Sequence, residues 1–164
     1  MRILGIDPGL AILGWGVIDS DRKGQQLVGY GCIYTTPEER FPDRLKHIAV
    51  YMRALLNSYH PDQIVYEELF FARNVTTALN VAAARGVSLS VCAEYTDELY
   101  EYTPMQIKQA ITGWGRAEKP QIQQMVKLLL KLDSIPKPDD AADAVAIALT
   151  HAAAGAAGAQ FRMK

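Results

Sequence analysis

The sequence lacks the features that mark disulfide-rich, zinc-binding, secreted and membrane proteins. Its 164 residues include two cysteines, Cys32 and Cys92, and no Cys or His stands at metal-ligand spacing, which excludes a disulfide framework and a zinc site. No apolar run approaches the roughly 20 residues of a membrane-spanning helix. Met1-Arg2 leads into the apolar residues 3–6 without the longer apolar region of a secretory signal. We therefore expect a cytoplasmic protein with reduced thiols and no membrane partner.

The sequence also lacks an excess of either charge sign, since 17 Lys and Arg oppose 18 Asp and Glu for a net charge of −1. This balance is unlike that of a generic nucleic-acid coat protein. The charges are nevertheless segregated: residues 105–137 carry six basic and two acidic residues, a net +4, and acidic stretches lie at 94–101 and 139–143. Basic patches around an acidic centre fit a polyanionic ligand, and the alternative is an ordinary solvated surface.

With 49% hydrophobic residues, a chain of this length can bury a real core. We expect one domain over residues 1–154 and a flexible C-terminal tail of small and polar residues, 155–164. The apolar pattern and the turn residues predict strands at 3–7, 13–20, 27–35, 63–67 and 100–103. They predict helices at about 45–59, 74–93, 105–111, 119–131 and 138–154. Three strands followed by alternating helices and strands indicate an α/β fold, with a five-stranded mixed β-sheet flanked by α-helices.

Carboxylates stand where such sheets place their ligands. Asp7 and Glu67 each close an apolar strand at its carboxyl end, although spacing alone does not distinguish Glu67 from Glu68. Asp140 and Asp143 are three residues apart and share one face of a helix. Converging carboxylates repel one another and are tolerated only around cations. Their hard oxygen ligands suit Mg²⁺ or Mn²⁺, and two such ions about 3.5–4 Å apart are a standard device for phosphodiester hydrolysis.

Each of these acids also has a purely structural explanation. Asp7-Pro8-Gly9 is an ordinary turn sequence, and acids that follow Pro138 suit a helix N-terminus. Asp143 is harder to explain in this way, because it lies in an Ala-rich stretch with no basic residue three or four positions away. Three histidines have no partnered motif and are interpreted as surface or capping residues: His47, His60 and His151.

Three blocks together resemble the RuvC family of Holliday-junction endonucleases: GIDPGL…GWGVID near the start, YEELFFARN in the middle and DDAADAVAIALTH near the end. GRAEKPQIQQMVKLLLKL at 115–132 and AARGV at 83–87 are similar to that family as well, so that the resemblance covers residues 1 to about 152. It implies an RNase H-like fold, a homodimer, Mg²⁺ dependence, and paired symmetric nicks in four-way junction DNA during recombination and repair. For the four carboxylates we expect two such ions per active site, with Mn²⁺ as a substitute. It also implies RuvA and RuvB, the branch-migration proteins, as partners.

The resemblance assigns roles to individual residues. The family's catalytic and metal-binding acids fall on Asp7, Glu67, Asp140 and Asp143, which selects Glu67 over Glu68. The expected DNA-binding residues are Phe70 at the rim of the active site, Lys108 and Lys119 against phosphate, and Arg73 and Arg85 as further candidates. The helix from residue 74 to about 93 corresponds to the family's dimer helix. Glu68, where relatives commonly carry Gln, and the additional acid Asp139 depart from the pattern and bear on metal affinity or pH optimum.

Three other functions stay open on the sequence. Another RNase H-like nuclease, acting on RNA:DNA hybrids or plain duplex, would use the same carboxylates. A junction-binding protein without catalysis would use them only as caps and turns. An actin-like phosphotransferase would explain Asp-Pro-Gly followed by a Gly-containing hairpin, although such enzymes usually need two domains.

Overall fold

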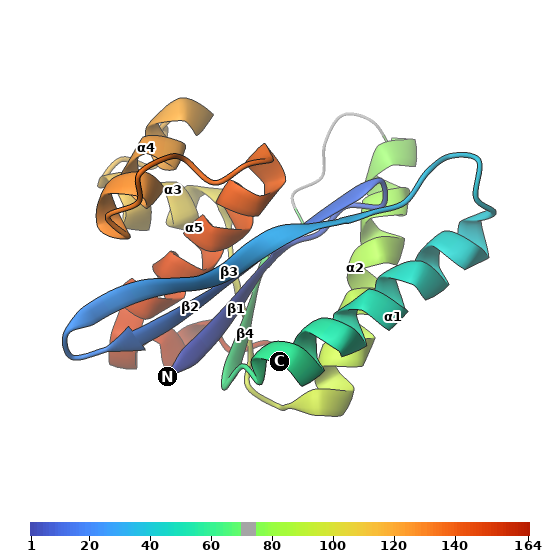
Figure 1. Cartoon of the computed structure of the whole chain (residues 1–164), viewed down its shortest axis with the longest axis horizontal. Coiled ribbons are helices and arrows are strands. Elements are labelled where there is room, and N and C mark those ends of the chain that lie inside the picture. The colour runs from blue at the N-terminus through green and yellow to red at the C-terminus, as the bar shows by residue number, and fades with distance from the viewer. Residues whose placement is uncertain (70–74) are drawn as a thin grey trace.

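The computed structural model describes residues 1–69 and 75–164, which form a five-stranded sheet with helices on both faces (Figure 1). The strands are β1 (Arg2–Asp7), β2 (Ile12–Asp21), β3 (Gly24–Tyr34), β4 (Gln63–Glu67) and β5 (Leu99–Tyr102). The helices are α1 (Phe41–Tyr59), α2 (Val75–Tyr95), α3 (Pro104–Thr112), α4 (Lys119–Leu129), α5 (Asp139–Ala154) and the 3₁₀-helix η1 (Gly155–Phe161). Every predicted strand and helix is present, with its ends shifted by a few residues.

The sheet has the strand order β3-β2-β1-β4-β5. The first three strands form an antiparallel meander, whereas β4 pairs parallel with β1 and β5 pairs parallel with β4. Helices α1 and α2 cover one face, and α3, α4 and α5 cover the other (Figure 1). The predicted α/β class and the mixed sheet are confirmed.

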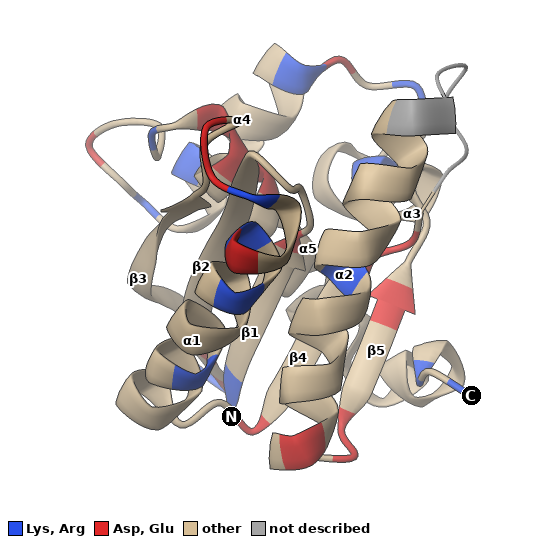
Figure 2. Ribbon diagram, turned by 90° about the vertical axis from the view of Figure 1, so that its right-hand side faces the viewer, with Lys and Arg blue, Asp and Glu red and all other residues tan. Residues whose placement is uncertain are grey.

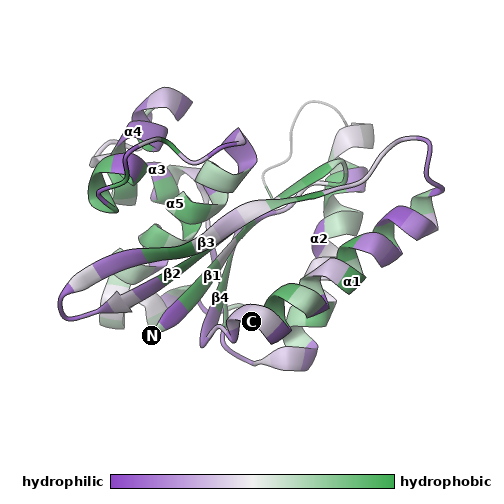
Figure 3. Cartoon of the chain, in the orientation of Figure 1, coloured by the Kyte–Doolittle hydropathy of each residue, from purple (hydrophilic) through white to green (hydrophobic). Residues whose placement is uncertain are grey.

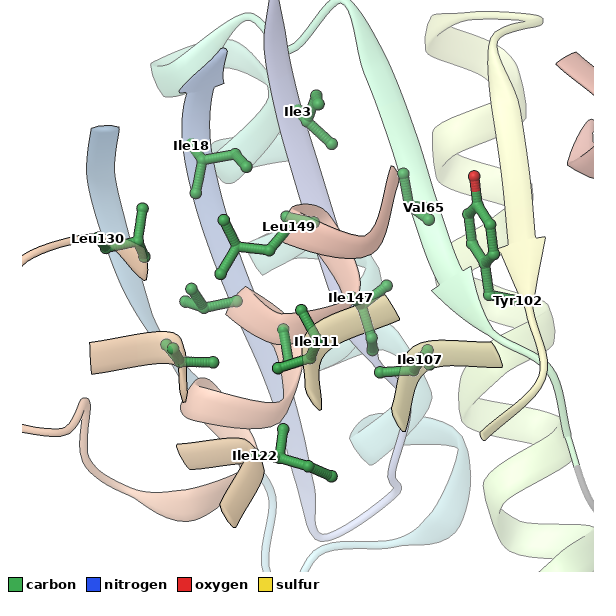
Figure 4. Close-up of a cluster of buried hydrophobic side chains, with 14 of the residues drawn as sticks. Ile3, Ile18, Val65, Tyr102, Ile107, Ile111, Ile122, Leu130, Ile147 and Leu149 are labelled. Carbon is green, nitrogen blue, oxygen red and sulfur yellow. The ribbon is translucent and has the colours of Figure 1, made fainter. Parts of the chain in front are cut away.

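Alternation along the strands divides the apolar side chains between two cores. Leu4 and Ile6 of β1 pack with α1 and α2. Ile3 belongs to the second core, where it lies with Val65 of β4 against the helices of the other face (Figure 4). The same alternation directs Asp7, four positions after Ile3, to the face that α5 covers.

Helix α5 is apolar on nearly all sides because it lies in the centre of the second core. Its residues 141, 142 and 144–151 are buried, and Figure 3 shows it as a largely hydrophobic ribbon beside the sheet. The helical segment Asp139–Phe161 is long and apolar enough to span a membrane, but half of its most apolar stretch is buried inside the protein. This burial is typical of a core helix in a globular protein.

Glycines in the strands let α5 lie directly on the backbone of the sheet. A Cβ atom on Gly14 would stand 2.1 Å from the carbonyl oxygen of Asp140, and one on Gly5 would stand 2.1 Å from that of Ala144. On Gly16 it would meet the Val145 side chain at 2.5 Å. Any larger residue at these positions would push the helix away from the sheet.

The C-terminal segment is folded onto the edge of the sheet, which differs from the flexible tail expected from the sequence. The N–H of Met163 donates to the carbonyl of Leu99 at 2.9 Å, and Arg162 forms a β-bridge with Tyr100. The ring of Phe161 lies 4.4 Å from that of Tyr102, centroid to centroid. This aromatic contact gives residues 155–164 an anchor that their small-residue composition does not suggest.

His151 corrects the interpretation of the histidines as surface or capping residues. It is 3% exposed, beneath η1. Its Nδ1 lies 2.8 Å from the Tyr102 hydroxyl and its Nε2 lies 2.9 Å from Gln63 Oε1. The amide oxygen can only accept, so Nε2 donates to it. Burial lowers the pKa of His151 to about 4, so that the ring is neutral at pH 7 and its Nδ1 accepts from the Tyr102 hydroxyl.

Candidate active site

The four predicted acids lie at the adjoining ends of β1, β4 and α5. Asp7 ends β1 and Glu67 ends β4, and these parallel neighbours bring their carboxyl ends to the same edge of the sheet. Asp140 and Asp143 lie at the start of α5, whose first turn rests on Gly14. Gly14 is also the register partner of Asp7 on β2. The close approach of α5 to the sheet therefore brings the two aspartates of the helix toward the acid of β1.

Asp7 is strongly perturbed by these surroundings. Burial raises the pKa of Asp7 to about 8, and the charges of Glu67, Asp143 and Asp140 add to the rise, while Lys119 opposes it. All three other acids thus act electrostatically on Asp7, as expected for carboxylates in one cluster.

Glu67 shares this environment. Burial and the charge of Asp143 raise the pKa of Glu67, against the opposing charges of Lys108 and Lys119. The neighbouring Glu68 is exposed. The structure thus resolves the ambiguity between the two glutamates, because Glu67 faces the cluster and Glu68 faces solvent.

A small pocket lies beside the cluster and brings acids and bases together. Its volume is about 170 Å³, and its charged lining residues are Glu67, Lys108, Lys119 and Asp143. Within it, Nζ of Lys119 lies 2.7 Å from Oδ2 of Asp143. Burial raises the pKa of Asp143, whereas the hydrogen bond and the charge of Lys119 lower it.

The chemistry of the donor set fits a divalent cation. The acids supply hard oxygen ligands from three elements, and burial together with the charges of the other three acids raises the pKa of Asp7, an environment in which a cation would favour the ionised carboxylate. Within residues 1–69 and 75–164, however, no three Asp, Glu, His or Cys side chains are grouped closely enough to hold an ion. The convergence of the four acids around a metal ion therefore stays a prediction, and in this structure Asp143 is paired with Lys119.

The other predicted site residues lie in different environments. The guanidinium of Arg85 lies 2.6 Å from Glu101 and 5.6 Å from the centre of the Tyr66 ring, so that it has a packing role in the monomer and its DNA contact stays a prediction. Asp139 pairs with Lys137 at 2.8 Å, and this hydrogen bond lowers the pKa of Asp139. Phe70 and Arg73 lie outside the described residues.

The sequence reasoning missed Gly14 and Gly16 as positioning residues, and it missed the ion pair of Lys119. Glycines at alternate positions of a strand, together with an Ala-rich helix, are a signal that could have revealed the close packing of α5. The ion pair joins two separate helices, and local spacing carries no signal for it.

Comparison with known proteins gives a consistent result. The profile of the family described as crossover junction endodeoxyribonuclease RuvC matches residues 3–151. The chain is 52% identical over 151 residues to the protein of that name from Finegoldia magna, with 92% of each chain covered. It is 49% identical over 164 residues to the one from Alkaliphilus metalliredigens, with 100% of each covered.

Solved structures extend the likeness to three dimensions. The Thermus thermophilus RuvC structure is similar with a TM-score of 0.88 and 37% identity, over 96% of this chain and 97% of that one. The T. thermophilus RuvC in complex with Holliday junction substrate gives a TM-score of 0.87 and 34% identity, over the same 96% and 97%. The yeast mitochondrial Holliday junction resolvase Ydc2 shares the fold, with a TM-score of 0.70 and 14% identity, over 98% of this chain and 82% of that one.

Proposed function

The chain belongs to the RuvC family of crossover junction endodeoxyribonucleases, and we propose that it resolves Holliday junctions with Asp7, Glu67, Asp140 and Asp143 as its catalytic acids. It is a DNA-cleaving hydrolase with an RNase H-like fold, as the relatives and the structural neighbours indicate. The observation that supports the four acids is geometric: Asp7 and Glu67 end the paired parallel strands β1 and β4, and the first turn of α5, which carries Asp140 and Asp143, lies on Gly14, the register partner of Asp7.

We infer that the cofactor of this metal-dependent family is Mg²⁺ here, with Mn²⁺ as a substitute and two ions per active site. Asp7, Glu67, Asp140 and Asp143 would hold them. When bound, the ions supply an activated water and stabilise the leaving oxygen of the phosphodiester. Asp7 must lose its proton to act as a ligand, and the cation charge favours that loss.

The lysines of the pocket account for binding of the DNA backbone. Lys108 of α3 and Lys119 of α4 flank the acids from the same side, where they can neutralise the phosphates of the strand to be cut. Because phosphate contacts release counterions, the affinity should fall steeply with salt. Phe70 and Arg73 complete the proposed DNA surface on the family resemblance, and Arg85 stays a weaker candidate.

Helix α2 supports the proposed homodimer. One of its faces is exposed and uncharged over most of its length and consists of Leu79, Ala82, Gly86, Ser90 and Ala93. Figure 2 shows α2 in front of the sheet as a mostly tan ribbon with few charged positions. In the sequence of α2 the charged residues are Arg85 and Glu94. Leu79 is 65% exposed, and exposure of such an apolar side chain to water is unfavourable. Packing of this face against a second copy of the chain would bury it. A two-fold dimer would offer one active site to each of two equivalent strands.

The cellular setting follows from the substrate and the family. The relatives are bacterial, and a protein that resolves junctions there would act in the cytoplasm. RuvA and RuvB are the proposed partners, because resolution follows branch migration.

The deciding experiment is cleavage of an end-labelled four-way junction with Mg²⁺ or EDTA, beside a linear duplex and an RNA:DNA hybrid of the same sequence. We expect paired, ligatable nicks in the junction alone and with metal alone. The Asp143→Asn variant should bind the junction and leave it uncut. Equal cleavage of duplex or hybrid would contradict the proposal in favour of a general nuclease. Binding without cleavage across several junction sequences would indicate a protein that only binds.

A further inference from the structure

Lys119 makes a contact that phosphate binding does not explain. Its ammonium is turned into the carboxylate cluster, 2.7 Å from Asp143, although 47% of the Lys119 side chain and 28% of the Asp143 side chain are exposed. An exposed lysine gains little from a single ion pair in water. The charges of Asp139 and Asp140 also act on Lys119. We therefore attribute the position of the ammonium to the combined negative charge of these acids and not to Asp143 alone.

The fold places Lys119 at this point. It is the first residue of α4, and the preceding Glu118 is fixed by the hydrogen bond of its N–H to Gln121 Oε1 at 2.8 Å. Ile122 and Val126 anchor the helix in the core. The start of α4 is therefore held in place, and from there the side chain of Lys119 reaches the Asp143 carboxylate.

The charge of Lys119 acts on most of the cluster. It lowers the pKa of Asp7, Glu67 and Asp143 against the effect of burial. Burial would lower the pKa of Lys119 itself, but Asp143, through its hydrogen bond and charge, outweighs burial, with smaller contributions from two other acids, and raises it. Lys119 is thus protonated, and its positive charge offsets the negative charges of the acids.

We propose that Lys119 is a positioning residue that serves as the internal counter-cation of the metal-free site and leaves Asp143 when a divalent cation binds. The inference rests on the proposed function, because it takes the four acids as the metal ligands. An ammonium and a metal ion compete for the same carboxylate oxygen, so Lys119 weakens metal binding while it stabilises the metal-free cluster. After the exchange its ammonium is free to meet a phosphate, which links metal loading to binding of the cut strand.

Lys108 provides a matched control. It lines the same pocket and its charge acts on Glu67, yet its ammonium forms no ion pair with any acid in the part of the chain that the structure describes. Removal of either lysine takes one positive charge from the pocket, whereas removal of Lys119 alone takes away a competitor for a ligand oxygen.

The test is a titration of the full chain with Mn²⁺, followed by the electron paramagnetic resonance signal of the free ion. We expect Lys119→Met and Lys119→Gln to bind Mn²⁺ about three- to five-fold more tightly than wild type, Lys108→Met to change less, and Lys119→Arg to resemble wild type. In EDTA, Lys119→Met should melt at a lower temperature than wild type, and saturating Mn²⁺ should close the difference.

Two results would overturn the proposal alone. Equal tightening in Lys119→Met and Lys108→Met would show that only net charge matters, and weaker Mn²⁺ binding in Lys119→Met would show that the lysine assists the metal. A wild-type protein that binds no Mn²⁺ and cuts no junction would instead refute the proposed function, and this inference with it.

Discussion

Asp7 opposes the stability of the metal-free protein, because its surroundings disfavour its ionised form. Its pKa is about 8 in the folded chain, against 3.8 as the ordinary value. Because Asp7 binds its proton more tightly in the folded chain than in the unfolded chain, its contribution to the free energy of unfolding is fully present below about pH 4. That contribution is lost as the pH rises through 8. We expect Asp7→Asn to abolish cleavage and to stabilise the protein in EDTA at pH 8.5 by about 2 kcal/mol, or about 4–8 °C in melting temperature.

Melting curves in EDTA at pH 5.5 and pH 8.5 check this prediction. The gain from Asp7→Asn should be larger at the higher pH, and saturating Mg²⁺ should remove the advantage by stabilising the wild type. The exposed Asp97, changed to Asn, is the matched control and should show no such dependence. A gain that does not vary with pH would mean that Asp7 ionises normally in the folded protein.

His151 gives a dependence of the opposite sign. Burial lowers the pKa of His151 to about 4, against the opposing charge of Glu98. Because the unfolded chain binds the proton first, stability is lost as the pH falls from about 6.5 through 4, by about 3 kcal/mol in full. The advantage of wild type over His151→Gln should therefore shrink between pH 7.5 and pH 4.5 in urea unfolding. A constant advantage for His151 would refute a buried neutral imidazole.

The contact between α5 and the sheet sets the geometry of the site at the level of whole elements. Gly14→Ala would place a methyl group 2.1 Å from the carbonyl oxygen of Asp140, where backbone must move. We expect a loss of about 3 kcal/mol in the free energy of unfolding and a strong loss of junction cleavage, because Asp140 and Asp143 move with the helix. Urea unfolding and the cleavage assay measure the two effects. Gly86→Ala adds a methyl group that meets nothing within 4 Å in the single chain, and in that chain it should be neutral or stabilise the helix by about 0.5–1 kcal/mol.

The same contact shows where prediction from sequence succeeds and where it stops. Apolar alternation and turn residues locate β1 and β4, and they place Asp7 and Glu67 at the ends of these strands, because such patterns are local. The spacing of Asp140 and Asp143 is local too. The partnership of Lys119 with Asp143, and the burial of His151 under η1, depend on how separate elements pack. No short window of sequence contains that information, so the histidine was wrongly interpreted and the ion pair was missed.

Coordination of the two nicks should depend on the assembly of the whole molecule through α2. On its exposed face, Gly86 has open space around it in the monomer, so that Gly86→Arg should leave the fold intact and place two charges into a proposed two-fold interface. We expect the mass in solution to fall from twice 18.1 kDa to 18.1 kDa, and junctions to accumulate single nicks in place of paired ones. Light scattering and gels under native and denaturing conditions measure both effects.

Gln124→Arg, on the exposed side of α4, is the control and should stay dimeric. A dimeric Gly86→Arg variant would move the interface away from α2, and paired nicks from a monomer would remove the need for a symmetric dimer.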